Sequence, residues 1–323
     1  MTIRKHSRTI VIIAPTAATA RTGNAHTAAR YASFFRSGGW RVRVRERWGG
    51  EACDVLVALH ARKSARSALA FARAFPDRPL VVVMTGTDLY RDIASSKLAQ
   101  RAMCAAHAIV TLQPDGIGYL PRAVRAKARA IVQSSPARTG AVSRRAGLKV
   151  CVLGHLRYEK DPLRAAYALQ RLSRDVPIRV IQAGAALQPR FASAAERIAR
   201  ADARYRWLGE VTHARALRIL RQSDLLVLSS RMEGGANVLS EAIAAGVPVV
   251  ASDISGNRGI LGASYPGYYP VGDTAACAAL LERFARDPRF ALALRRRVRA
   301  LAALVRPARE RRLWLSLLRE LPS

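Results

Sequence analysis

The stretch that most constrains the fold of this chain is residues 225–262. It opens on the apolar run LLVL at 225–228, which is typical of a strand buried on both faces. A loop with two glycines follows at 229–235, and a helix is predicted over 237–245. The apolar run VPVVA at 247–251 predicts a second buried strand, and the remainder is a turn rich in small residues. These segments predict a strand–loop–helix–strand unit of a parallel sheet.

The loop at 229–236 is expected at the carboxyl end of its strand, where open parallel sheets bind ligands. Asn237 is predicted to cap the following helix, whose N-terminus offers free N–H groups and a partial positive charge suited to phosphate. Glu233 lies in this loop, and Glu241 lies about one turn into the helix. A carboxylate beside a phosphate site is costly unless it binds cations or hydroxyls. Sugar and ribose diols supply such hydroxyls.

The rest of the chain alternates in the same way between predicted strands and predicted helices, which indicates doubly wound α/β architecture. Strands are expected at 9–14, 40–44, 54–60, 79–84, 108–112, 130–134, 148–154, 178–184, 205–209, 225–228 and 247–251. A linker is predicted from composition at 136–145. After residue 276 the chain is expected to be helical, and its last helix, at 312–321, is amphipathic.

Length and composition fit a cytoplasmic protein with two domains. The chain has 323 residues, of which 50% are hydrophobic, enough to bury two cores. It has no apolar run of the roughly 18 residues that a membrane span needs, and no secretory signal opens it. Its four cysteines lack the C-x2-C spacing of a metal or redox site, so we expect reduced, buried thiols. They are Cys53, Cys104, Cys151 and Cys277.

The net charge of +32 first suggests nucleic acid or an anionic membrane as a partner. Lysine occurs only at positions 5, 63, 97, 127, 149 and 160, so nearly all of the positive charge is arginine, as a GC-rich coding bias would produce. The arginines are also spread along helices, except in a basic tail at 295–299 and 306–312. We therefore favour solvated helix faces, with a field that would steer anionic substrates inward.

Polar residues also follow three predicted strands of the N-terminal half. Gly23 and Asn24 come after the first strand, where glycine lets the backbone approach a ligand and asparagine can cap a helix. His60 is the last residue of the strand expected at 54–60, and Arg62 and Lys63 follow it. The next strand is followed by Thr85, Gly86, Thr87 and Asp88. Two cations, a histidine and several hydroxyl or N–H donors would suit the binding of a small anion that accepts a transferred group.

The segment EGGANVLSEAIAAGVPVVASDISGN resembles the Glu-x7-Glu signature of the retaining GT4 glycosyltransferases, which have the GT-B fold. The resemblance implies that Glu241 binds the ribose of a nucleotide and that Glu233 faces the transferred sugar. It also implies two Rossmann-like domains facing across a cleft, with a C-terminal helix crossing back. We expect an acceptor domain at 1–146, a UDP-sugar donor domain at 147–304, and the returning helix at 305–323.

The segment GHLRYEKDP at 154–162 carries the same resemblance. Lys160 matches the family lysine that holds the donor diphosphate, where a cation stabilises the leaving UDP. His155 stands where the family usually has arginine, and Arg157 is expected to supply the missing cation. The remaining residues that the resemblance places at the donor are Gly23, Gly154, Gly234, Gly235, Asn237, Val238 and Leu239. The Asp-x-Asp metal signature of the other glycosyltransferase fold is absent, so we expect no metal and no cofactor.

A narrower resemblance spans essentially the whole chain. The segments ALHARKS, TGTDLYRD and GHLRYEKDP, with Gly-Asn after the first strand, are similar to the selenosugar synthases of selenoneine biosynthesis. These enzymes join selenophosphate to UDP-GlcNAc or UDP-glucose, giving a 1-seleno sugar. The resemblance implies that the acceptor is held by Asn24, His60, Arg62, Lys63 and Thr85 to Asp88.

Two other functions stay open on the sequence. One is an ordinary GT4 hexosyltransferase that acts on a glycan or lipid hydroxyl, with the basic tail docking on an anionic membrane. The other is a basic nucleic-acid binder on the same scaffold, since fold alone does not fix function. Glu233, Glu241 and Lys160 argue against the second, because a nucleic-acid binder has no use for paired acids there.

Overall fold

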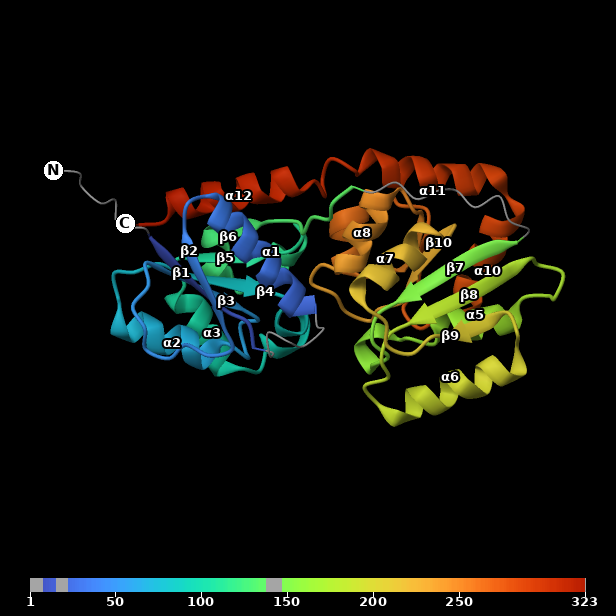
Figure 1. Ribbon diagram of the computed structural model, residues 1–323, viewed down its shortest axis with the longest axis horizontal. Helices are drawn as coiled ribbons and strands as arrows, with labels where there is room; N and C mark the ends of the chain where they lie inside the picture. The colour runs from blue at the N-terminus through green and yellow to red at the C-terminus, as the bar shows by residue number, and fades with distance from the viewer. Residues whose placement is uncertain (1–7, 16–22, 138–146, 323) are drawn as a thin grey trace. The chain divides into compact units, whose positions relative to one another are not determined.

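The computed structural model describes residues 8–15, 23–137 and 147–322 (Figure 1). They divide into two compact units. The first contains the described residues up to Gln133 together with those from Pro307 onward, and the second runs from Ser134 to Arg306. Most of the linker predicted at 136–145, and the predicted boundary at 146, lie outside the described residues.

The first unit is built on a six-stranded, wholly parallel sheet of order β2-β1-β3-β4-β5-β6. Its strands are β1 (Thr9–Ile13), β2 (Arg41–Arg45), β3 (Val55–Leu59), β4 (Leu80–Met84), β5 (Ala108–Thr111) and β6 (Ala128–Ala130). Its helices are α1 (Gly23–Ser37), α2 (Ala65–Ala74), α3 (Lys97–Ala105), α4 (Gly116–Tyr119) and α12 (Pro307–Glu320). It also has two short turns, a π-helical one at Asp88–Asp92 and a 3-10 helix at Arg122–Lys127.

Alternation of side chains along the strands gives this sheet two apolar faces. Val11 and Val82 lie in a cluster that includes buried residues of α2 and α3. Ile12 and Val83 lie in a second cluster on the other face, with residues of α1 and α12. A parallel sheet covered on both faces requires the near-continuous apolar strands that the sequence shows.

The last helix, α12, packs on α1 and so completes the first unit (Figure 1). Trp314 is fully buried, and its ring lies 4.5 Å from that of Tyr31 and 5.4 Å from that of Phe35. Aromatic contacts at these separations stabilise a packed interface beyond the area they bury. The chain therefore returns to the unit in which it began.

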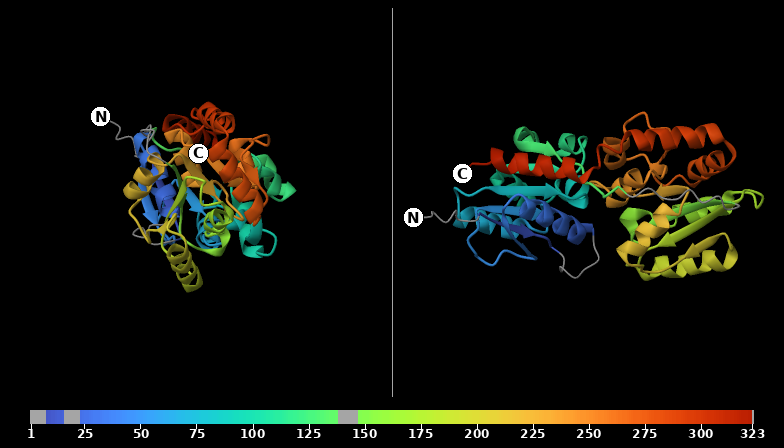
Figure 2. Two further views of the ribbon diagram at one scale, coloured as in Figure 1. Left: turned by 90° about the vertical axis from the view of Figure 1, so that its right-hand side faces the viewer. Right: turned by 45° about the horizontal axis from the view of Figure 1, so that its top comes forward.

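The second unit repeats the architecture, with a parallel sheet of order β12-β11-β10-β7-β8-β9. Its strands are β7 (Leu148–Leu153), β8 (Ile178–Ala183), β9 (Tyr205–Trp207), β10 (Leu225–Leu228), β11 (Val249–Ser252) and β12 (Tyr268–Tyr269). Its helices are α5 (Arg164–Arg171), α6 (Pro189–Ala201), α7 (His213–Arg221), α8 (Asn237–Ala245), α9 (Ser255–Leu261), α10 (Thr274–Arg286) and α11 (Pro288–Ala300). Figure 2 shows yellow α6 on one side of the strands and the orange-red α10 and α11 on the other. Two such sheets confirm the predicted α/β class.

Three local predictions are wrong. The strand expected at 130–134 is instead Ala128–Ala130; residues beyond it are buried, but they leave the ladder with β5 after Ile131. The turn expected at 252–262 contains the helix α9. Cys104 is exposed, whereas the other three cysteines are buried.

Candidate functional site

In the second unit, the loops after β7 and β10 are joined side by side. The two strands are parallel neighbours in the sheet, so both loops leave at the same edge. Ser229, just after β10, donates its hydroxyl to the carbonyl oxygens of Lys160 and Asp161 at 3.0 and 2.8 Å. Residues 69 and 68 positions apart in sequence thereby form one surface.

Lys160 and Glu233 meet on that surface. The Lys160 ammonium donates a hydrogen bond to Oε1 of Glu233, and the Ser230 hydroxyl donates to the same oxygen at 2.7 Å. The side chains of Lys160 and Glu233 are 22% and 11% exposed, so both charges are largely withdrawn from water. The sequence named both residues but did not show that they pair. A ligand anion at Lys160 would therefore meet a cation that is already bound to a carboxylate.

The main chain of Glu233 is held against α9. A Cβ on Gly256 would lie 1.9 Å from the Glu233 carbonyl oxygen, so only glycine allows this approach. Ser252 donates its hydroxyl to the Ser230 carbonyl at 2.5 Å, and Asn257 donates to the Ser252 carbonyl at 2.8 Å. The missed helix α9 is thus what fixes the loop that carries Glu233.

Glu241 lies on the first turns of α8, where the helix prediction placed it. Its Oε1 lies 2.8 Å from Nε2 of His213, at the start of α7. The structure corrects the predicted cap, because Ala236 occupies the N-cap position and Asn237 is the first helical residue. Leu239 is fully buried, so its side chain belongs to the core, while Val238 is half-buried.

The ends of β7 and β8 bring two backbones into close contact. A Cβ on Gly184 would lie 2.0 Å from the Gly154 carbonyl oxygen, and both glycines have positive φ, +151° and +147°. His155 follows, and its Nδ1 accepts a hydrogen bond from the amide of Ala185 at 3.3 Å. Arg157 is half-buried, and its Nε lies 4.0 Å from a carboxylate oxygen of Glu159.

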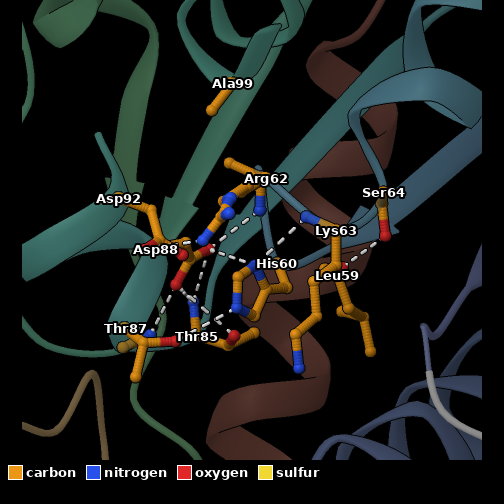
Figure 3. Close-up of polar contacts among 12 residues, drawn as sticks. Leu59, His60, Arg62, Lys63, Ser64, Thr85, Thr87, Asp88, Asp92 and Ala99 are labelled. Atoms are coloured by element: carbon orange, nitrogen blue, oxygen red, sulfur yellow. Dashed lines mark hydrogen bonds and ion pairs between the residues drawn. The ribbon is translucent and has the colours of Figure 1, made fainter. Parts of the chain in front are cut away.

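In the first unit, a buried carboxylate joins the ends of β3 and β4 (Figure 3). Asp88 is fully buried and accepts hydrogen bonds from the amides of Ala61, Thr85 and Gly86 at 2.8, 2.9 and 2.8 Å. Such amide donors stabilise a carboxylate in the absence of water. Asp88 therefore holds the two loops together from inside, and its carboxylate is not exposed to a ligand.

His60 sits on the same junction in the left-handed conformation, with φ at +68°. Burial lowers the pKa of its imidazole, outweighing the nearby Asp88 carboxylate, so the ring is neutral at pH 7. Nδ1 accepts from the Lys63 amide at 3.4 Å, which places the proton on Nε2, 3.1 Å from the Thr87 hydroxyl. His60 thus has a donor, not a free lone pair, at Nε2.

The two cations beside His60 are exposed. Arg62 Nη1 lies 3.2 Å from Oδ1 of Asp92, which Arg91 also contacts at 3.2 Å. Figure 3 shows the Lys63 side chain extending away from the carboxylates of Asp88 and Asp92. Gly23 and Asn24 begin α1. The residues just before them lie outside the described part of the chain.

In the described part of the chain, no three His, Cys, Asp or Glu side chains are arranged to hold a metal ion. Across the same residues, no helix has both the length and the apolar composition needed to cross a membrane.

Comparison with known families finds a match that lies within the second unit. Residues 142–301 match the model described as Glycosyl transferases group 1. The matched stretch, just under half of the 323 residues, is therefore similar to a group 1 glycosyl transferase domain. The chain is also 33% identical over 150 residues to the glycogen synthase of Mycobacterium tuberculosis strain H37Rv. That match covers 46% of this chain and only 36% of the relative.

Solved structures extend the likeness of fold to the whole chain. HepE of Anabaena, in complex with UDP and glucose, superimposes with a TM-score of 0.76 at 15% identity, covering 97% of this chain and all of that one. Sucrose-phosphate synthase of Thermosynechococcus elongatus gives 0.77 at 16% identity, covering 97% and 99%. The fold is GT-B, as predicted.

Proposed function

We propose that this protein is a cytoplasmic glycosyltransferase that moves GlcNAc or glucose from a UDP-sugar to selenophosphate, as in selenoneine biosynthesis. The group 1 domain supports the coarser part, a UDP-sugar-dependent transferase. HepE, whose fold is similar, is a protein that binds UDP and glucose. The acceptor is the finer part of the proposal and rests on the residues of the first unit.

The donor would bind on the surface formed by the loops after β7 and β10. Lys160 would stabilise the charge that develops on the leaving UDP, assisted by Arg157. Glu241 would bind the ribose hydroxyls, and Glu233 would orient the transferred sugar. The Lys160–Glu233 pair supports these roles, since one ligand that carries both phosphate and sugar would reach both members.

The acceptor proposal is carried by one observation: the groups that could remove a proton at the β3–β4 junction are already engaged. Asp88 accepts three backbone amides, and Asp92 is bound to Arg62 and Arg91. The lone pair of His60 accepts from Lys63. A hydroxyl acceptor needs a base to take its proton, whereas selenophosphate arrives as an anion. The exposed Arg62 and Lys63 would suit its charge.

The reaction balances without an oxidant or a metal. The selenium lone pair forms the C1–Se bond while the C1–O bond to UDP breaks and its electron pair leaves with UDP. Water then cleaves the Se–P bond, which releases phosphate and the 1-seleno sugar. Asn24, Thr85, Gly86 and Thr87 would hold the phosphate oxygens of the acceptor by hydrogen bonds.

The alternative is a GT4 hexosyltransferase that acts on a glycan or lipid hydroxyl. The similarity to glycogen synthase, an enzyme named for a glycan, favours it. Such an acceptor would need a base other than the engaged groups at the β3–β4 junction.

The test is mass spectrometry of the products from purified protein, UDP-GlcNAc or UDP-glucose, and selenophosphate, with thiophosphate as a second acceptor. We expect a sugar that carries the isotope pattern of selenium, formed with UDP and lost in Glu241→Ala. UDP release only when a sugar or lipid alcohol is added would establish the alternative. Release of UDP without a selenosugar would refute the selenium acceptor.

A further inference from the structure

Arg231, two residues before Glu233, has no part in the proposed donor site. Arg231 lies between Ser230 and Glu233 on the loop after β10. It is half-buried, and its Nε is buried with no hydrogen-bond partner among the described residues. Ordering a long arginine side chain costs conformational entropy, so its contacts must offset that cost.

Arg231 contacts the residues on both sides of Lys160. Its backbone amide donates to the carbonyl oxygen of Glu159 at 2.8 Å. Its guanidinium lies over the ring of Tyr158, 4.9 Å from the centroid, within the range of a cation–π contact. Its Nη2 lies 3.6 Å from Oδ1 of Asp161. Arg231 thus contacts the turn at 158–161 through both its backbone amide and its side chain.

The turn at 158–161 has an unusual backbone conformation at Asp161, the residue after Lys160. Asp161 has a φ of +43°, in the left-handed region that residues with a side chain rarely adopt. Its carboxylate is held on its other side by Arg164, at 3.0 and 3.2 Å. Removing the Arg231 side chain would take away the contacts with Tyr158 and Asp161. The turn would stay attached through the two Ser229 hydrogen bonds, the backbone hydrogen bond from residue 231 to Glu159 and the Lys160–Glu233 pair.

We infer that Arg231 is a positioning residue that fixes the Lys160 ammonium for the donor diphosphate, an inference that rests on the proposed donor site. The loop of Arg231 also carries Glu233, so one residue sets the spacing between the lysine and the carboxylate. Displacement of a charged group by about 1 Å is enough to weaken its effect on a bound substrate by orders of magnitude. Arg231 does not itself need to touch the ligand.

The experiment measures UDP affinity by calorimetry in the full-length protein and in the variants Arg231→Ala, Arg231→Lys, Lys160→Ala and the double alanine variant. Arg231→Ala should weaken UDP binding about tenfold or more, the loss typical of one charge-assisted hydrogen bond. In the Lys160→Ala background the same change should have little effect, because Arg231 acts through the lysine. Arg231→Lys, which can still pair with Asp161 and stack on Tyr158, should recover part of the affinity.

The control is Arg197→Ala, an exposed arginine on α6, which should bind UDP as the unaltered protein does. Uridine, which lacks the diphosphate, should lose little affinity in any of the Arg231 variants. Losses from Arg231→Ala and Lys160→Ala that simply add, or a uridine loss as large as the UDP loss, would overturn the positioning role. If the unaltered protein binds no UDP, the proposed donor site itself is wrong, and the two failures are thereby distinct.

Discussion

Arg30 on α1 and Glu310 on α12 form an ion pair of 3.1 Å that fastens the last helix of the chain to one of its first. The Glu310 side chain is fully buried, whereas that of Arg30 is 18% exposed. The pair borders the stack of Tyr31, Phe35 and Trp314, so charge and aromatic packing hold the same junction. Because Glu310 is buried and Arg30 reaches water, losing one charge has a different energetic cost from losing the other.

Removing the arginine should therefore cost more stability than neutralising the glutamate. Arg30→Ala leaves a carboxylate without water or its cation, and we expect it to lower the free energy of unfolding by about 2 kcal/mol. Glu310→Gln keeps a polar group of the same shape and should cost about half as much. Urea unfolding followed by tryptophan fluorescence measures both. Arg311→Ala, an exposed neighbour on α12, is the control, and a larger loss in Glu310→Gln than in Arg30→Ala would contradict the prediction.

The four thiols should react at two very different rates. Burial raises the pKa of Cys53, Cys151 and Cys277 to about 12, which suppresses the reactive thiolate. Cys104 is exposed. Ellman's reagent should therefore label one thiol rapidly in the native protein and the other three only as the chain unfolds. The fast phase should vanish in Cys104→Ser, and a fast phase that persists there would mean that a second thiol is accessible.

Much of the fold could be predicted because a parallel sheet buries its strands on both faces. Runs such as LLVL at 225–228 and LVVVM at 80–84 are fully buried strands, as their composition indicated. The prediction failed where residues are buried but do not pair with a neighbouring strand. Residues 132–135 (VQSS) are buried, but they lie beyond the last ladder pair of β6, Thr111 with Ala130. Helix α9 was missed because SGNRG has the composition of a turn.

The site was predictable as a set of residues but not as a set of contacts. The Glu-x7-Glu frame indicated Glu233 and Glu241, yet the partners of these carboxylates are Lys160 and His213, 73 and 28 positions away. Asp88 was expected at an acceptor, but it is fully buried among backbone amides. Local patterns report which strand end a residue occupies, whereas its partners depend on which strands become neighbours. Arg231 gave no signal at all, since its role depends on the turn at 158–161.

The close approach of Gly256 to Glu233 makes this glycine a sensitive position beside the loop that carries Glu233. Gly256→Ala would place a methyl group 1.9 Å from the Glu233 carbonyl oxygen, so the loop must move. On the proposed role of Glu233 in orienting the transferred sugar, we expect turnover of UDP-GlcNAc to fall at least tenfold, because small displacements of an orienting group are costly. UDP release under saturating donor measures it. Gly118→Ala, whose added methyl group would meet open space, is the control, and equal turnover in the two variants would show that the loop adapts without loss.

His60 should make the protein less stable in mild acid. Burial lowers the pKa of its imidazole below the usual value of 6.5, so between the folded pKa and about pH 6.5 the unfolded chain binds a proton that the folded chain does not. The free energy of unfolding must then fall as the pH drops below about 6.5 and be unaffected by this group at higher pH. His107, whose pKa is also lowered by burial, contributes in the same direction.

His60→Asn isolates the contribution of His60, because asparagine tolerates the left-handed backbone at this position and does not titrate. Urea unfolding at intervals from pH 5 to pH 8 should show a shallower loss of stability in this variant than in the unaltered protein, with the remaining slope due partly to His107. The Asp88 carboxylate opposes the shift, so Asp88→Asn should steepen the loss by removing the charge that favours the imidazolium. Identical slopes in the unaltered protein and His60→Asn would mean that the imidazole is protonated equally in the folded and unfolded chains, so burial would not lower its pKa.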